Sequence, residues 1–209
     1  MNERDAVLFV VDDDAAMRRS LAYLFESAGW RVATFETAHD FLDHYGGHVP
    51  GCLVLDVRMP LMSGLELQQT LKDHGINLPV IFLTGHGDLA MAVQAMKTGA
   101  CDFLEKPCKD QVLLDAVTRA VLRSIEECRI SGQTRTAQSA LATLTARERE
   151  VAELMAAGKP SKIIARELAI SDKTVQVHRH NTMEKLGVHS AAEIAHLLMA
   201  AKAGHPGSH

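Results

Sequence analysis

The sequence lacks several features that would assign it to other classes of protein. No apolar run approaches the roughly 20 residues that a membrane-spanning helix needs. The start, Met1 to Asp5, does not have the basic and then apolar layout of a secretory signal, and we expect a cytoplasmic protein. No Gly-x-x-x-x-Gly-Lys-Ser/Thr motif occurs, so a P-loop nucleotide site is unsupported.

Cysteine is also scarce, and its 4 residues fall in no paired metal-ligand spacing. A chain of 209 residues does not need a disulfide framework to fold. We therefore expect Cys52, Cys101, Cys108 and Cys128 to be buried or idle thiols. A redox role for Cys101 or Cys108 stays open as an alternative.

What is present is an ordinary globular composition, 47% hydrophobic and 23% charged, with an uneven distribution of charge. Residues 1–127 carry 11 Lys and Arg against 19 Asp and Glu. Residues 128–209 carry 11 basic against 7 acidic residues. An acidic front half and a basic back half suggest two domains, of which only the second suits a polyanion.

The front half alternates short apolar runs with helical patterns. Strands are predicted at 6–11, 31–35, 52–55, 79–83 and 102–104, and helices at 15–28, 38–45, 64–73, 88–97 and 109–127. Apolar runs without alternation suit strands that are covered on both faces, and the strand–helix order predicts a parallel sheet. We therefore predict an α/β domain with a five-stranded doubly wound sheet, flavodoxin-like, in the common order 2-1-3-4-5.

The back half is predicted to be helical after a linker. Residues 126–142 are polar and small and show no clear periodicity, which is typical of a linker. Helices are predicted at 145–157, 161–168, 172–186 and 191–202. Thr145 with Glu148 forms a capping box, and Ser171 and Ser190 cap the last two helices. We expect an all-α four-helix domain over 143–202.

Polar residues follow four of the five predicted strands. They are Asp12, Asp13 and Asp14 after the first, Asp56 after the third, Thr84 after the fourth and Lys106 after the fifth. Ligands of open parallel sheets bind beyond the carboxyl ends of the strands, and these four strands are neighbours in the predicted order. The polar side chains should therefore converge on one rim.

The chemistry of these side chains is coherent. Neighbouring carboxylates repel one another by roughly 1 kcal/mol per pair at 4 Å in water, so a cation is expected among them. Mg²⁺ suits Asp12 and Asp13, and Asp56 is then a carboxylate nucleophile able to carry a phosphoryl group. Lys106 would add fixed positive charge. The alternative for a single acidic pair is helix capping, which we expect to be the only role of Asp14.

The ordered set of motifs resembles bacterial response-regulator receiver domains over residues 5–125. It comprises Val-Asp-Asp, then Leu-Asp-Val-Arg-Met-Pro-Leu-Met-Ser-Gly, then Thr-Gly and Lys-Pro. The resemblance implies that Asp56 accepts phosphate from a sensor histidine kinase. It also implies that Asp12, Asp13, Asp56 and the Arg58 backbone carbonyl bind Mg²⁺, and that Thr84 and Lys106 contact the phosphoryl group.

Two further positions follow from the receiver resemblance. Phe103 stands where the family has an aromatic switch, although a plain core role on a short strand remains the alternative. Lys-Pro is usually followed by Phe in such domains, whereas this chain has Cys108. That departure leaves the phosphoryl chemistry alone but bears on how the last helix packs.

The helix at 172–186 is a candidate for insertion into the major groove of DNA. At helical spacing, Val175, His178, Thr182 and Leu186 share a stripe that faces the scaffold, while Lys173, Gln176, Val177 and His180 share another. Val177 suits a thymine methyl and Gln176 suits adenine. The full set of expected DNA contacts is Lys162, Lys173, Thr174, Gln176, Val177, Arg179, His180 and Lys185.

The back half resembles the LuxR-type helix-turn-helix over residues 143–202, and the two-domain arrangement is similar to the FixJ/NarL class of two-component response regulators. The resemblance rests on three segments, which are Leu-Thr-Ala-Arg-Glu-Arg-Glu-Val, Ile-Ala-Arg-Glu-Leu and the run from Thr-Val-Gln-Val-His to Lys-Leu-Gly-Val. A protein-interaction bundle is the alternative that this resemblance disfavours. The family often has Lys or Glu at Gln176, so the target sequence does not carry over.

The resemblance implies that phosphorylation promotes a homodimer through the fourth helix, fifth strand and fifth helix, and hence binding to promoter DNA and regulation of transcription. RNA polymerase is a further possible partner. We expect no enzymatic activity beyond slow self-dephosphorylation. The alternatives are an aspartate-nucleophile phosphohydrolase, which needs a general acid where this chain has Arg58, and a constitutive DNA binder with a purely structural front domain.

Overall fold

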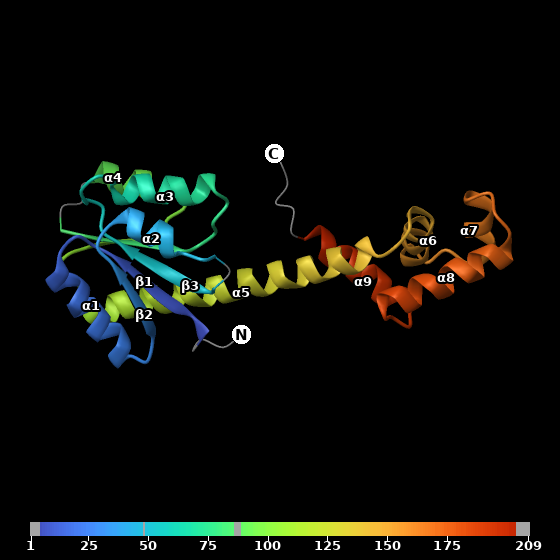
Figure 1. The fold of residues 1–209 in the computed structure, drawn as a ribbon, viewed down its shortest axis with the longest axis horizontal. Helices are drawn as coiled ribbons and strands as arrows, with labels where there is room; N and C mark the ends of the chain where they lie inside the picture. Colours follow the sequence, from blue (N-terminus) through green and yellow to red (C-terminus); the bar gives the residue numbers. More distant parts are fainter. Residues whose placement is uncertain (1–4, 48, 86–88, 204–209) are drawn as a thin grey trace. The chain divides into compact units, whose positions relative to one another are not determined.

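The structure is a computed structural model that describes residues 5–47, 49–85 and 89–203. These residues form two compact units that divide between Cys128 and Arg129. Figure 1 shows the first unit in blue to green and the second in yellow to red. The first is an α/β unit and the second is all helical, as the sequence predicts.

The first unit contains five parallel strands in the order β2-β1-β3-β4-β5, which confirms the predicted topology. The strands are β1 (Val7–Val11), β2 (Arg31–Phe35), β3 (Gly51–Leu55), β4 (Val80–Thr84) and β5 (Asp102–Glu105). The helices between them are α1 (Ala15–Ser27), α2 (Ala38–His44), α3 (Gly64–Asp73) and α4 (Leu89–Thr98), and α5 (Asp110–Ala142) follows. Asp88, which we assigned to the fourth helix, lies outside the described residues.

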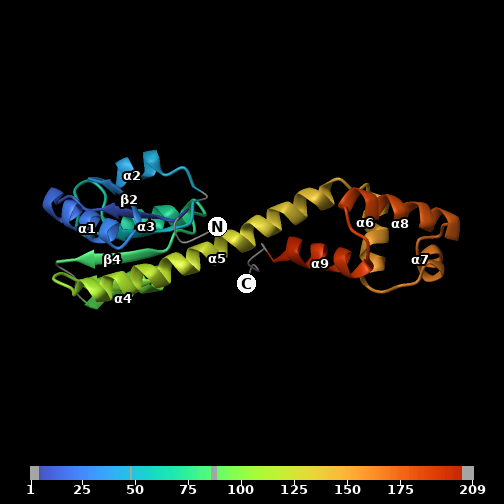
Figure 2. The same ribbon diagram turned by 90° about the horizontal axis from the view of Figure 1, so that it is seen from below.

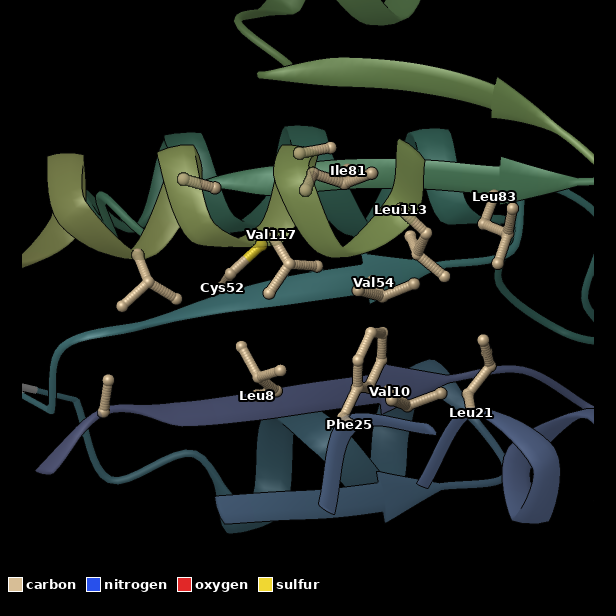
Figure 3. Close-up of a cluster of buried hydrophobic side chains, with 14 residues drawn as sticks. Leu8, Val10, Leu21, Phe25, Cys52, Val54, Ile81, Leu83, Leu113 and Val117 are labelled. Carbon is tan, nitrogen blue, oxygen red and sulfur yellow. The ribbon is translucent and has the colours of Figure 1, made fainter. Parts of the chain in front are cut away.

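Both faces of this sheet are covered, which is why its central strands are apolar without alternation. Every residue of β3 and β4 is buried. On one face, α1 and α5 place Phe25, Leu113 and Val117 against the strands (Figure 3). On the other face, α2, α3 and α4 place Phe41, Leu67 and Ala95 there. The core therefore holds the strand ends, and the polar residues after them, at one rim.

The helix α5 corrects one prediction. We expected it to end near residue 127, but it continues without a break to Ala142. Residues 129–142 contain no proline, the residue that most strongly ends a helix, and their polarity alone did not end it. Their buried side chains are Thr134, Ala137 and Leu141. The segment that we interpreted as a linker is thus helical, and from Arg129 on it belongs to the second unit.

The second unit packs four further helices with this end of α5 (Figure 2). They are α6 (Ala146–Ala156), α7 (Ser161–Glu167), α8 (Asp172–Leu186) and α9 (Ala191–Lys202). Its core includes Val151, Met155, Ile164, Val175 and Ile194. None of the helices in the described part of the chain combines the length and the apolar character needed to cross a bilayer.

The predicted helix caps of the second unit are confirmed. Thr145 and Glu148 form the reciprocal capping box, and the hydroxyls of Ser171 and Ser190 accept backbone hydrogen bonds at the starts of α8 and α9. Gly187 ends α8 with a φ of 62°, a left-handed conformation that glycine adopts without a steric cost. These caps fix where α8 begins and ends.

Candidate functional site

Three carboxylates meet at the rim of the sheet, as expected. Asp12 and Asp13 follow β1, and Asp56 follows β3. Because β1 and β3 are paired in parallel with Val11 opposite Leu55, the residues after them lie side by side. One carboxylate oxygen from each of the three residues lies within 4.8 Å of the others.

Lys106 supplies positive charge to the same place. It follows β5, and its Nζ lies 2.6 Å from Oδ2 of Asp12 and 3.5 Å from Oδ2 of Asp56. The side chains of Lys106, Asp12 and Asp56 are only 16%, 3% and 13% exposed, so water screens this contact poorly. Three carboxylates against one ammonium leave the cluster with a negative charge.

The residues present fit a divalent cation. Oδ1 of Asp56 is buried and accepts no hydrogen bond from the described residues. A buried carboxylate oxygen without a partner is costly, and a hard cation would satisfy it. Oxygen-only donors with excess negative charge are the set that Mg²⁺ prefers. Asp12, Asp13 and Asp56 could therefore hold a divalent metal ion.

Asp14 has a different role, as predicted. It caps α1, and its carboxylate accepts hydrogen bonds from the backbone N–H groups of Ala16 and Met17. These two hydrogen bonds lower the pKa of Asp14 below its usual value, and the bond from Ala16 contributes more than the bond from Met17. Sequence reasoning did not single out Arg18, whose guanidinium donates to the backbone carbonyl of Asp12 at 2.7 Å. Arg18 therefore holds the backbone of a candidate metal ligand.

The loop after Asp56 is held close to it by a glycine. A Cβ on Gly64 would lie 2.2 Å from the backbone oxygen of Asp56, so no other residue fits there without a shift of the backbone. The N–H of Gly64 also donates to the backbone oxygen of Val57 at 2.9 Å. This contact explains the glycine of the Ser-Gly pair in the motif, and the serine, Ser63, caps α3.

The remaining receiver positions lie on β4, β5 and the loop. Thr84 is the last residue of β4 and is 1% exposed, and its backbone oxygen accepts from the N–H of Lys106 at 2.8 Å. Phe103 is half-buried, with its ring centroid 5.9 Å from that of Phe82. The side chain of Arg58 is exposed.

The cysteines show no reactive setting. All four are free, and Cys52 is buried. Burial is the main cause that raises the pKa of Cys101 and Cys108 above the usual thiol value. A raised pKa disfavours the thiolate, which is the reactive form, so the structure gives no support to the redox alternative.

The helix α8 presents the two faces that its sequence predicts. Val175 and Thr182 are buried against the scaffold, and His178 and Leu186 are half-buried. The other stripe, Lys173, Gln176, Val177 and His180, is exposed. Val177 is 52% exposed on this face, where its methyl groups are accessible to a partner. Lys162 is exposed on α7, and Thr174 and Arg179 are half-buried on α8.

Lys185 is already engaged within the second unit. Its Nζ lies 2.6 Å from Oε2 of Glu148, which is 4% exposed. The hydrogen bond from Lys185, followed by that from the Thr145 backbone, lowers the pKa of Glu148 from 4.5 to about 2. We interpreted Glu148 as a cap and Lys185 as a phosphate contact. The two residues are separated by 37 in the sequence, so no local pattern reveals this pairing.

Each of the two units matches a known protein family. Residues 8–118 match the response regulator receiver domain family, and residues 142–198 match the luxR family of bacterial regulatory proteins. The chain belongs to the response regulators that join these two domains. It is thus a regulator of transcription of the two-component type, with a receiver and a LuxR-type DNA-binding domain.

Individual relatives cover nearly the whole chain. The transcriptional regulatory protein TdiR of Thauera aromatica is 46% identical over 93% of this chain and 86% of its own. The transcriptional regulatory protein FixJ of Bradyrhizobium diazoefficiens is 42% identical over 93% of this chain and 95% of its own. The solved structure of the response regulator StyR matches with a TM-score of 0.86 at 44% identity, over 93% of this chain and 98% of StyR.

Proposed function

We propose that Asp56 accepts a phosphoryl group from the phosphohistidine of a sensor histidine kinase, and that this modification controls DNA binding by the second unit. The observation that carries the proposal is the buried Oδ1 of Asp56, which has no hydrogen-bond partner among the residues that the structure describes and lies beside two carboxylates and Lys106. A carboxylate oxygen of Asp56 attacks phosphorus, the N–P bond of the donor breaks, and the nitrogen leaves with its electron pair.

The residues around Asp56 then have separate tasks. Asp12, Asp13, Asp56 and the backbone carbonyl of Arg58 would hold Mg²⁺, which when bound offsets the negative charge on the phosphoryl oxygens. Lys106 contributes fixed charge without a proton transfer. The hydroxyl of Thr84 donates to a phosphoryl oxygen once that oxygen is present.

The phosphoryl group is the switch of the first unit. It adds about two negative charges beside Lys106. Thr84 moves toward it, and Phe103, whose ring centroid lies 5.9 Å from that of Phe82, turns inward. The surface of α4, β5 and α5 changes as a result and forms a homodimer. Turning a mostly inactive population into a mostly active one needs up to about 5.5 kcal/mol, which phosphoryl contacts and a dimer interface together supply.

The second unit reads promoter DNA with α8 in the major groove. Gln176, Val177 and His180 face the bases, and Lys162, Lys173, Thr174 and Arg179 contact the backbone. Lys185 is the weakest member of this set, because its charge is shared with Glu148. RNA polymerase is a partner at the promoter, and the cytoplasm is the place of action.

The hydrolase alternative is disfavoured by one residue. Such an enzyme protonates its leaving group with an acid two residues after the nucleophile, where this chain has Arg58. A guanidinium does not release its proton in proteins, so it cannot act as that acid. Slow self-dephosphorylation is the only turnover that we propose.

The test uses acetyl phosphate with Mg²⁺, mass spectrometry for the acyl phosphate and light scattering for the dimer. The wild-type protein should form the acyl phosphate and the dimer, and Asp56→Asn should form neither. Asp43→Asn, which changes an exposed aspartate of α2, is the matched control and should behave as wild type. Removal of Mg²⁺ by EDTA should abolish the modification.

Two results would count against the proposal. Phosphorylation or stimulated dimerisation of Asp56→Asn would show that another residue is the acceptor. Equal DNA affinity with and without beryllofluoride and Mg²⁺ would favour a constitutive DNA binder whose receiver is structural.

A further inference from the structure

Two polar side chains connect α7 and α8 beside the predicted DNA-reading face. Nε2 of Gln176 donates to Oγ of Ser161 at 3.2 Å. Ser161 is the first residue of α7 and is half-buried, whereas Gln176 is exposed on α8. The contact therefore joins a half-buried serine on one helix to an exposed glutamine on the next.

The hydroxyl of Ser161 is not spent on helix capping. The cap position of α7 is Pro160, which makes no side-chain cap hydrogen bond. In contrast, the hydroxyls of Ser171 and Ser190 cap α8 and α9. Ser161 thus has a hydroxyl in a position where helix formation does not require one.

The hydrogen-bond inventory of this pair leaves three groups for a ligand. A serine hydroxyl that accepts a bond retains its own hydrogen as a donor. The amide of Gln176 retains Oε1 and one N–H, which are the acceptor and donor that pair with N6 and N7 of adenine.

We propose that Ser161 is a positioning residue for sequence recognition. It holds the amide of Gln176 in the orientation that reads adenine. Glutamine otherwise samples many rotamers, and ordering one of them on binding costs affinity for the correct base. This inference rests on the proposed DNA binding of the second unit and assigns part of its specificity.

The inference predicts a loss of specificity rather than of general affinity, because phosphate contacts position a protein while base contacts specify sequence. The experiment starts with selection of a binding site from random DNA by the full-length protein with beryllofluoride and Mg²⁺. Affinities are then measured for that site and for every single base-pair change, for wild type, Ser161→Ala, Gln176→Ala and the double variant.

Wild type should discriminate by about tenfold or more at one A·T pair. Gln176→Ala should remove that preference, and Ser161→Ala should reduce it to a few-fold at the same pair and at no other. The double variant should be no worse at this pair than Gln176→Ala. Ser161→Thr, which keeps the hydroxyl, should restore discrimination, and Ser139→Ala, an exposed serine of α5, should leave it intact.

The opposing results are distinct. If Ser161→Ala keeps full discrimination, or weakens all sites equally, Ser161 does not position Gln176 and the inference is wrong. If the wild-type protein selects no sequence at all, the proposed function fails, and the inference fails with it.

Discussion

The two units carry their candidate sites in opposite ways. In the first, Asp12 and Thr84 are 2% and 1% exposed and come from different strand ends. In the second, the reading face lies on one helix and is exposed, with Val177 at 52%. Chemistry on a phosphoryl group needs charges fixed out of water, where they act strongly. Reading DNA needs side chains that a large partner can reach. The burial of each candidate site thus matches the partner that we propose for it.

If the two units are separate, damage to one core should spare the other. Phe82→Ala removes a fully buried ring from the sheet and should cost about 3–5 kcal/mol of receiver stability. Hydrogen exchange on the full-length protein should show lost protection in residues 5–128 and retained protection in 143–202. Met155→Ala, in the core of the second unit, should lose protection in residues 143–202 and retain it in residues 5–128. Loss of protection throughout the chain in either variant would mean that the units fold as one.

The Glu148–Lys185 pair should make the second unit sensitive to acid. The folded-state pKa of Glu148 is about 2 against 4.5, so its contribution to stability is fully present above pH 4.5. That contribution is lost as the pH falls from 4.5 toward 2. The denaturation midpoint of the helical unit should therefore fall over this range, and Glu148→Gln should flatten the fall.

The control for that experiment is Glu150→Gln, which changes an exposed glutamate of the same helix and should preserve the pH dependence. An unchanged acid response in Glu148→Gln would show that other carboxylates are responsible.

The end of α5 can be tested as part of the second unit. The hydroxyl of Thr134 donates to the backbone oxygen of Ala200 at 3.0 Å, in the last turn of α9. Thr134→Val should lower the free energy of unfolding of this unit by about 0.5–1.5 kcal/mol. Thr136→Val, whose hydroxyl bonds only within α5, should have a smaller effect. Equal losses of unfolding free energy in the two variants would mean that residues 129–142 only connect the two units and do not stabilise the second.

The smallest effect should come from one exposed charge. Lys173→Ala should weaken binding to all DNA sequences alike and reduce the slope of log affinity against log salt by about 0.9. Lys202→Ala, at the end of α9, should leave the slope unchanged. A change in base preference in Lys173→Ala would reassign this lysine from the backbone to a base.

Much of the fold and of the receiver site was predictable, because both have local signatures. Strand runs, helix caps and the polar residue after each strand are visible in the order of residues, and parallel topology brings strand ends together. The end of α5 was not predictable in this way. Its residues 129–142 show no clear periodicity. The contacts that join them to the second unit, such as that of Gln138 with the Ala201 carbonyl, link elements far apart in the sequence, and no local pattern reveals them.

The sequence alone determined the two-unit organisation, the strand order, the acidic cluster with Lys106 and the exposed face of α8. Only the tertiary structure decided which side chains pair between elements. Lys185 forms an ion pair with Glu148. Ser161 accepts a hydrogen bond from Gln176, and Arg18 donates one to the backbone carbonyl of Asp12. Periodicity and spacing report the environment of a residue along its own element. A contact between two elements depends on how they pack, and no repeat in the sequence encodes it.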